Sequence, residues 1–149
     1  MIDLLNLTAR DLQGLMAAGK LTAQDLVEAC LANIGRHNER GMGLRAITST
    51  APLDIALARA AALDAERADG RVRSRLHGIP LIVKDNFITH PSLGMDTTCG
   101  TVALRGARPR RNAVVIDKLI EAGMIVIGKA SLSVSSTPNV HGRRLAVLI

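Results

Sequence analysis

Hydrophobic positions near the start of the chain recur at the spacing of amphipathic helices. Thr22-Ala-Gln-Asp25 has the form of a capping box, and the apolar positions after it repeat every three or four residues. Thr8 can cap an earlier helix over residues 9–18, and Gly19 is a suitable stop for it. The apolar stripe of the second helix consists of Ala23, Leu26, Val27, Cys30, Leu31 and Ile34.

A third helix is predicted after a short extended segment at residues 45–48. Pro52 suits the first turn of this helix, because proline has a fixed φ and no N–H to lose there. The alanine-rich sequence that follows favours a helix ending near Gly70.

The second half of the chain alternates between apolar runs and a helical pattern. Residues 79–83 form an apolar run closed by Lys84, which is typical of a buried strand that delivers a functional group at its C-terminal end. Asn112 opens a helix that ends at Gly123, and residues 124–127 form a second apolar run. Strand, helix and strand in this order predict a parallel crossover in an α/β fold.

Composition agrees with one globular domain. The chain has 149 residues, of which 48% are hydrophobic and 21% charged. Phe87 is its one aromatic residue apart from histidine, so the core must consist of aliphatic side chains and methionine. A protein of this composition has no aromatic platform on which to stack bases or sugars.

The positive charge of the chain does not indicate a nucleic-acid partner. An excess of 19 Lys and Arg over 13 Asp and Glu gives a net charge of +6. The arginines gather in two loop-like stretches, residues 71–75 and 105–111, without interleaved aromatics or a known nucleic-acid motif. We expect these arginines to lie in surface loops and to be solvated.

Cysteine usage and the N-terminal sequence favour a soluble cytoplasmic protein. Cys30 and Cys99 are too few for a disulfide framework, which favours a reducing compartment. Residues 1–6 lack the basic and apolar regions of a signal peptide, and the run at 124–127 is far shorter than a membrane helix. We therefore expect no membrane association.

Three ordered blocks resemble the opening motifs of the amidase signature family. They are Leu76-His-Gly-Ile-Pro-Leu-Ile-Val-Lys-Asp-Asn86, Gly94-Met-Asp-Thr-Thr-Cys-Gly100 and Leu119-Ile-Glu-Ala-Gly-Met-Ile-Val-Ile-Gly-Lys-Ala-Ser-Leu-Ser133. With the helices upstream, the resemblance spans about residues 8–133. It implies the N-terminal part of the amidase-signature fold, with helices around a mixed, largely parallel sheet. The expected division is therefore a family domain over 1–133 and a divergent tail over 134–149.

The resemblance also implies a chemistry. Members of the family hydrolyse the C–N bond of carboxylic amides with a Ser, cis-Ser, Lys triad and need no cofactor, and Lys84 matches the catalytic lysine. Burial suits a lysine to this task, because an amine that loses its proton near neutral pH can act as a base toward a serine hydroxyl. The substrate of the intact family enzyme would be a small-molecule amide.

Other candidate residues have structural interpretations. Asp85 and Asn86 are expected to fix the loop after the strand through side-chain hydrogen bonds to the backbone, and Lys129 is expected to be structural. Cys99 has no identifiable His partner for nucleophilic catalysis. The spacing of the histidines matches no metal motif, so no metal site is predicted; they are His37, His77, His90 and His141.

The sequence contains no glycine- and serine-rich block of the kind that holds the two family serines. The serines that follow Lys129 lack this context; they are Ser131, Ser133, Ser135 and Ser136. We therefore expect a chain truncated before the catalytic serines and inactive alone. The alternatives are a non-catalytic interaction module that pairs with an unidentified chain and a small basic nucleic-acid binder.

Overall fold

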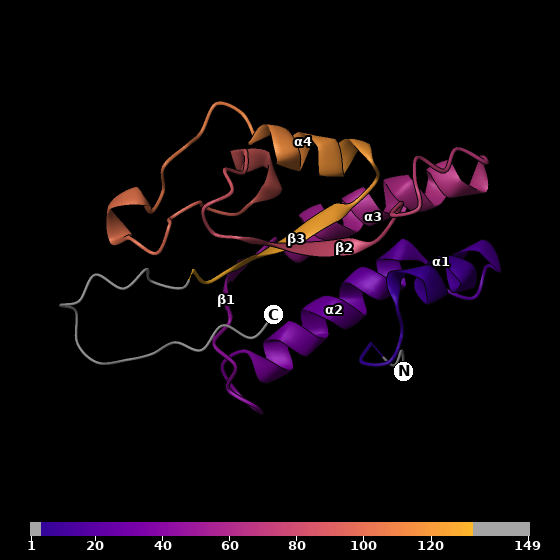
Figure 1. The fold of residues 1–149 in the computed structure, drawn as a ribbon, viewed down its shortest axis with the longest axis horizontal. Coiled ribbons are helices and arrows are strands. Elements are labelled where there is room, and N and C mark those ends of the chain that lie inside the picture. Colours follow the sequence, from indigo (N-terminus) through magenta and orange to yellow (C-terminus); the bar gives the residue numbers. More distant parts are fainter. Residues whose placement is uncertain (1–3, 133–149) are drawn as a thin grey trace.

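The computed structural model describes residues 4–132, which form four α-helices, two short 3₁₀ helices and a three-stranded sheet (Figure 1). The expected boundary between a domain over 1–133 and a tail over 134–149 lies outside the described residues. The helices are α1 (Ala9–Ala17), α2 (Ala23–His37), α3 (Leu53–Ala68) and α4 (Val114–Glu121), with η1 (Pro91–Leu93) and η2 (Val102–Leu104). The strands are β1 (Ile47–Thr50), β2 (Pro80–Lys84) and β3 (Ile125–Ala130).

The sheet is mixed, in the order β1-β3-β2. β2 pairs with β3 in parallel and β1 pairs with β3 antiparallel. The crossover through α4 and the mixed α/β fold confirm the sequence prediction. β3 occupies the centre because both other strands pair with it. β2 is an edge strand of the described sheet and is only partly buried, so the prediction that it is a buried strand is wrong.

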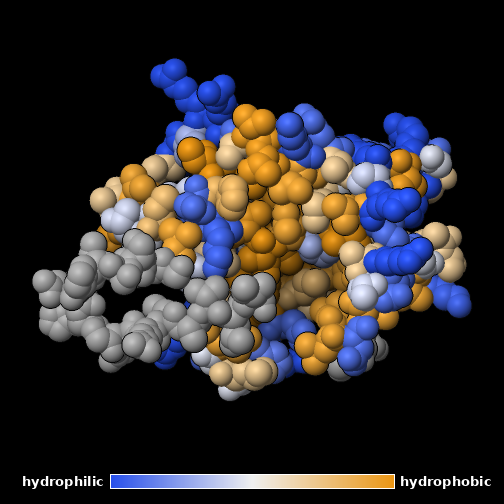
Figure 2. Space-filling model, viewed as in Figure 1, coloured by the Kyte–Doolittle hydropathy of each residue, from blue (hydrophilic) through white to orange (hydrophobic). Residues whose placement is uncertain are grey.

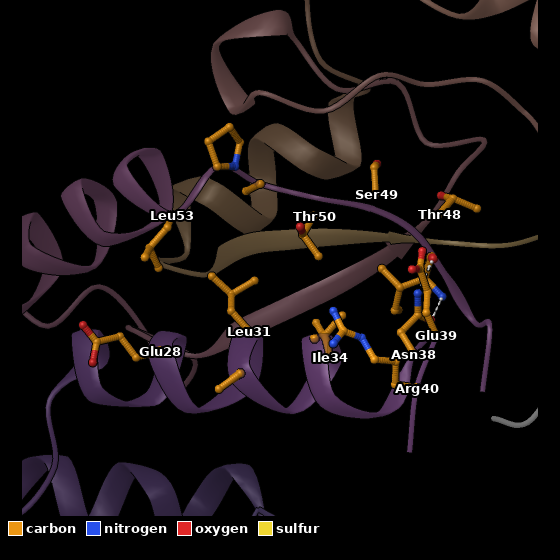
Figure 3. Close-up of a pocket in the computed structure, with 15 residues that line it drawn as sticks. Glu28, Leu31, Ile34, Asn38, Glu39, Arg40, Thr48, Ser49, Thr50 and Leu53 are labelled. Atoms are coloured by element: carbon orange, nitrogen blue, oxygen red, sulfur yellow. Dashed lines mark hydrogen bonds between the residues drawn. The ribbon is translucent and has the colours of Figure 1, made fainter. Parts of the chain in front are cut away.

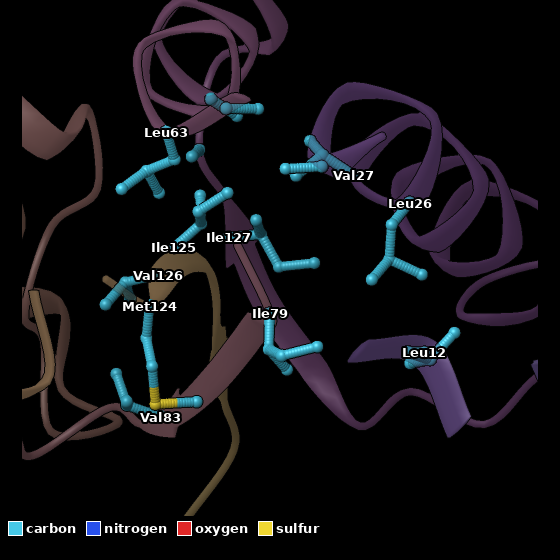
Figure 4. Close-up of a cluster of buried hydrophobic side chains, with 14 of the residues drawn as sticks. Leu12, Leu26, Val27, Leu63, Ile79, Val83, Met124, Ile125, Val126 and Ile127 are labelled. Carbon is cyan, nitrogen blue, oxygen red and sulfur yellow. The ribbon is translucent and has the colours of Figure 1, made fainter. Parts of the chain in front are cut away.

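The core lies between β3 and the helices. The first five residues of β3 are all buried, as expected for a strand covered on both faces. α2 and α3 pack against each other and against the sheet, and α4 packs on β3 (Figure 1). Figure 4 shows Leu63 of α3 and Val27 of α2 facing Ile125 and Ile127 of β3, and all four side chains are almost fully buried.

The predicted capping box at Thr22 is present, and the predicted cap at Thr8 also forms a capping box with Asp11. The Asp25 amide donates to the Thr22 hydroxyl at 3.0 Å, and the Thr22 amide donates to the Asp25 carboxylate at 3.0 Å. The Thr22 hydroxyl, which donates to the Asp25 carboxylate at 2.6 Å, and the Thr22 amide together hold the pKa of Asp25 below its usual value. A second carboxylate, that of Asp64 in α3, accepts from the amides of Ala23 and Gln24 at 2.7 and 3.2 Å. The start of α2 is thereby fixed to α3 as well as capped.

The first residues of α4 and β1 differ from the sequence prediction. In both places an asparagine side chain forms hydrogen bonds next to the start of the element. α4 begins at Val114 and not at Asn112, whose side chain accepts from the His90 amide and donates to Asp117 at 2.7 Å. β1 begins at Ile47, where Asn38 at the end of α2 pairs with both backbone groups of Ile47 at 2.9 Å.

His77, in front of β2, bonds to three other segments of the chain. Its ring is fully buried, with Nε2 2.9 Å from the Leu63 carbonyl and Nδ1 accepting from the Arg73 amide at 3.2 Å. Its own carbonyl accepts from Gln13 and Arg67 at 2.7 and 2.9 Å. Both ring nitrogens thus have hydrogen-bond partners, and the residue links α1, α3 and the loop before β2.

We expect Gly123→Ala to lower the free energy of unfolding by about 3 kcal/mol, because strain and overpacking add. Gly123 has a φ of +90°, and a Cβ there would lie 2.8 Å from Nδ1 and 3.0 Å from Cα of His77. Gly19→Ala is the matched control, since Gly19 has a φ of +65° but nothing within 4 Å of its added Cβ. Strain alone should cost about 1 kcal/mol there. Urea unfolding measures both, and equal losses would contradict the packing argument.

Exposed apolar side chains line a groove that reaches the edge strand β2. Hydrophobic residues are visible across the middle of the face in Figure 2, where the sheet lies in Figure 1. Ile82 in β2 is 40% exposed, and Met42 and Leu44 line the same groove at 71% and 48% exposure. Exposed apolar edge strands favour intermolecular pairing.

We expect Ile82→Thr to slow aggregation several-fold, because it removes apolar surface from the edge while retaining a β-branched residue. Val83→Thr is the matched control, since Val83 is buried and the new hydroxyl would cost about 1–3 kcal/mol if left unpaired. Light scattering at fixed protein concentration and temperature follows both variants. Faster aggregation of Ile82→Thr than of the parent would refute the role of this edge.

Candidate functional site

Lys84 lies at the C-terminal end of β2, as the sequence predicted. Its side chain is half-buried, and Nζ donates to the backbone carbonyl of Ser131 at 3.0 Å. The strand pairing continues one step further, because the Asp85 amide donates to the Ala130 carbonyl at 2.9 Å. The Phe87 amide then closes a turn on the Lys84 carbonyl at 3.0 Å. The backbone on both sides of Lys84 is therefore fixed, while its amine points toward the segment that leaves β3.

Asp85 holds a loop that is distant in sequence. Its buried carboxylate accepts from the Thr98 hydroxyl, from the Thr98 amide at 3.2 Å and from the Gly100 amide at 3.4 Å. Between them, the Cys99 amide donates to the Asp85 carbonyl at 3.3 Å, and Cys99 and Gly100 both have positive φ. Asp85 thus has the predicted side-chain-to-backbone bonds. Asn86 is exposed and forms no such bond within residues 4–132, contrary to expectation.

Lys129 ends in the same region. It is fully buried, and Nζ donates to the Phe87 carbonyl, to Thr97 Oγ1 at 3.0 Å and to Thr89 Oγ1 at 3.4 Å. Burial lowers the pKa of this ammonium below its usual value, and the Asp85 carboxylate and the Cys99 thiol act in the opposite direction.

Four of the five buried polar or charged residues in the described chain gather around the ends of β2 and β3. They are Asp85, Thr89, Thr97 and Lys129; the fifth is His77. The sequence singled out Lys84, Asp85 and Lys129 but missed the two threonines. Thr97 lies within the second family-like block, whereas nothing in the sequence indicates that Thr89 would lie 3.2 Å from it.

The remaining nucleophile candidates do not form a site with Lys84. Ser131 approaches Lys84 with its backbone carbonyl, and Ser133 and the later serines lie outside the described residues. Cys99 is exposed, and no His hydrogen bond to it occurs in the described part of the chain. Cys30 is partly buried on α2, which raises the pKa of its thiol and makes it less reactive.

A groove elsewhere on the surface lacks the residues for this chemistry. It lies between the C-terminal half of α2 and the segment from β1 into α3, with Glu28, Leu31 and Thr48 among its lining residues (Figure 3). Lys84 lies outside it. Among residues 4–132, no three His, Cys, Asp or Glu side chains are close enough to hold a metal ion. None of the described helices is long and apolar enough to cross a membrane.

Comparison with known proteins identifies relatives of the whole described fold. The profile of the family described as Amidase matches residues 25–138. A glutamyl-tRNA(Gln) amidotransferase subunit of Chloroflexus aurantiacus is 43% identical over 129 residues, which is 87% of this chain and 25% of that protein. The chain thus spans about a quarter of the length of the curated relatives it matches.

Solved structures give the same result. The peptide amidase from Stenotrophomonas maltophilia is 41% identical with a TM-score of 0.81, and the match covers 88% of this chain and 26% of that one. An amidase family protein from Bacillus anthracis is 35% identical with a TM-score of 0.79 over 88% of this chain and 25% of its own. The chain therefore belongs to the amidase signature family and has the fold of the N-terminal part of its members.

Proposed function

We propose that this chain carries the catalytic lysine, Lys84, of a hydrolase that cleaves the C–N bond of carboxylic amides. The observation that supports it best is the position of Lys84, half-buried at the end of a parallel strand, where the polar cluster of Asp85, Thr89, Thr97 and Lys129 also lies. Functional groups in α/β folds commonly lie at this end of the strands.

The reaction class is proposed without a particular substrate. The relatives' names include a peptide amidase and a glutamyl-tRNA(Gln) amidotransferase subunit. Amide C–N cleavage is the chemistry that the family resemblance implies, and the acyl and amine pockets would involve residues outside the matched quarter. The two cysteines are unpaired, which supports a reducing compartment such as the cytoplasm.

Lys84 supplies the terminal base of this mechanism. A neutral amine accepts the proton that leaves the nucleophilic serine through the cis-serine, and it returns that proton to the departing amine. Its hydrogen bond to the Ser131 carbonyl restrains the amine without using its lone pair, because the nitrogen is the donor. Because the sequence contains no glycine- and serine-rich block, we propose that the nucleophile, the proton relay and the oxyanion donors come from elsewhere and that the 149-residue chain is inactive alone.

The purified chain should not hydrolyse amides above the uncatalysed rate, because one member of a triad cannot turn over substrate. A panel of aliphatic and aromatic amides, followed by release of the free amine, tests this with a Lys84→Ala variant in parallel. Turnover that disappears in Lys84→Ala would sink the prediction. It would point to a nucleophile within the chain, and Ser131, Ser133 and Cys99 would then be substituted first.

A chimera tests the role of Lys84 itself. The matched segment replaces its counterpart in the Stenotrophomonas maltophilia peptide amidase, to which it is 41% identical. Lys84→Ala in an active chimera should lower kcat by about 10²–10⁴-fold, the usual contribution of a positioned base. Lys118→Ala is the control, since Lys118 is exposed on α4. If Lys84→Ala keeps kcat within about tenfold of the parent chimera, Lys84 is not the base.

A further inference from the structure

Lys129 is an unusual lysine. Lysine is almost never fully buried without partners, yet this side chain has 0% exposure. Its three N–H groups match three acceptors, the Phe87 carbonyl and the hydroxyls of Thr89 and Thr97. No carboxylate lies within salt-bridge distance of it in the described residues, and Asp85 is the acidic group that acts on it electrostatically. The ammonium is thus satisfied mainly by neutral oxygens.

The three acceptors all belong to the chain that follows Lys84. Phe87 closes the turn on the Lys84 carbonyl with its amide and accepts from Lys129 with its carbonyl. Thr89 donates its amide to Thr97 Oγ1 at 3.1 Å, and Lys129 contacts both of their hydroxyls. Lys129 therefore reaches from β3 and ties together the two ends of the loop that begins after β2.

The strand register separates the two lysines. Val83 pairs with Lys129, and Lys84 pairs with Ala130. Paired residues of a parallel ladder lie on one face and neighbours along a strand alternate, so the side chains of Lys84 and Lys129 leave the sheet on opposite faces. Lys129 can therefore act on Lys84 through the backbone of the turn at Phe87.

Such a cluster has an energetic cost. Removing an ammonium from water costs several kcal/mol, and well-packed apolar residues in its place are often neutral or stabilising. The buried ammonium lies at the ends of β2 and β3, the same end of the sheet as Lys84, while the rest of the sheet core is apolar. Buried polar groups that break the usual pattern gather at functional sites.

We propose that Lys129 is a positioning residue for Lys84. By holding the Phe87 carbonyl, it fixes the turn that begins at Lys84 and thereby the direction of the Lys84 amine toward Ser131. By holding Thr97, it also fixes the start of the Thr98–Gly100 loop that Asp85 binds. The inference rests on the proposed catalytic role of Lys84, and its physical content is testable without activity.

The test is Lys129→Met in the 149-residue chain, with Lys118→Met on the exposed face of α4 as the matched control. Methionine retains the length and loses the three donors. NMR of ¹³Cε-labelled lysine should show a distinct Lys84 signal with contacts to residue 131 in the parent and in Lys118→Met. In Lys129→Met the signal should move to the position of exposed Lys20 and lose these contacts.

Amide hydrogen exchange separates a local effect from general destabilisation. In Lys129→Met, exchange at Phe87, Cys99 and Gly100 should accelerate by about tenfold or more, as expected of local opening. The amides of Gly78 and Met124, which bond to Gly123 and Leu119, should change by less than about twofold. Thr97→Val removes one acceptor of Lys129, so exchange should accelerate at the same amides but by a smaller factor. If Lys129→Met does not fold, this variant tests the positioning role.

The outcomes distinguish the two proposals. An unchanged Lys84 signal in Lys129→Met, or in Thr97→Val if the first variant does not fold, overturns the positioning role and leaves the catalytic role of Lys84 intact. Uniformly faster exchange at all amides also overturns it, because Lys129 would then support only global stability. A displaced Lys84 signal together with a Lys84→Ala chimera that stays active confirms the positioning contact and removes the catalytic role.

Discussion

The parallel pairing of β2 with β3 determines where the polar chemistry of this chain lies. A parallel ladder brings the carboxyl ends of both strands to one edge, so Lys84 and Lys129 finish within one register step of each other. It also requires a long crossover, which here includes α4 and the loop that Asp85 and Lys129 hold. Without this pairing, the residues of the polar cluster would have no common location.

β3 can support this arrangement because it is covered on both faces. Its isoleucines pack toward α2 and α3, and Lys129 extends the same buried strand with a charged group. The strand therefore changes from apolar to polar within a few residues, from Ile127 to Lys129. The flexible stem of lysine fits an apolar surrounding, while its ammonium reaches the carbonyl and hydroxyls beyond the strand end.

Local signals predicted much of this fold, and long-range contacts explain the rest. The capping boxes at Thr8 and Thr22 depend on residues three apart, so the starts of α1 and α2 could be read directly. The run ending at Lys84 predicted a strand, but its edge position depends on partners elsewhere in sequence. Asn112 was predicted to start a helix because asparagine is a common N-cap residue. Its side chain instead accepts from the His90 amide, 22 residues away, and no local sequence pattern indicates this bond. The burial of Lys129 could not be predicted either, because its partners Phe87, Thr89 and Thr97 are also distant in sequence.

The geometry of Lys84 suits the proposed role of a base whose site is completed by other residues. A neutral amine has two N–H donors and one lone pair. The Ser131 carbonyl takes one donor at 3.0 Å, and it belongs to the segment that leaves β3, so the same strand pairing that fixes the lysine backbone also fixes its tip. In the proposed role, the lone pair of the neutral amine would be available to a serine hydroxyl. On this proposal, preorganisation of the base is separable from the nucleophile that it would serve.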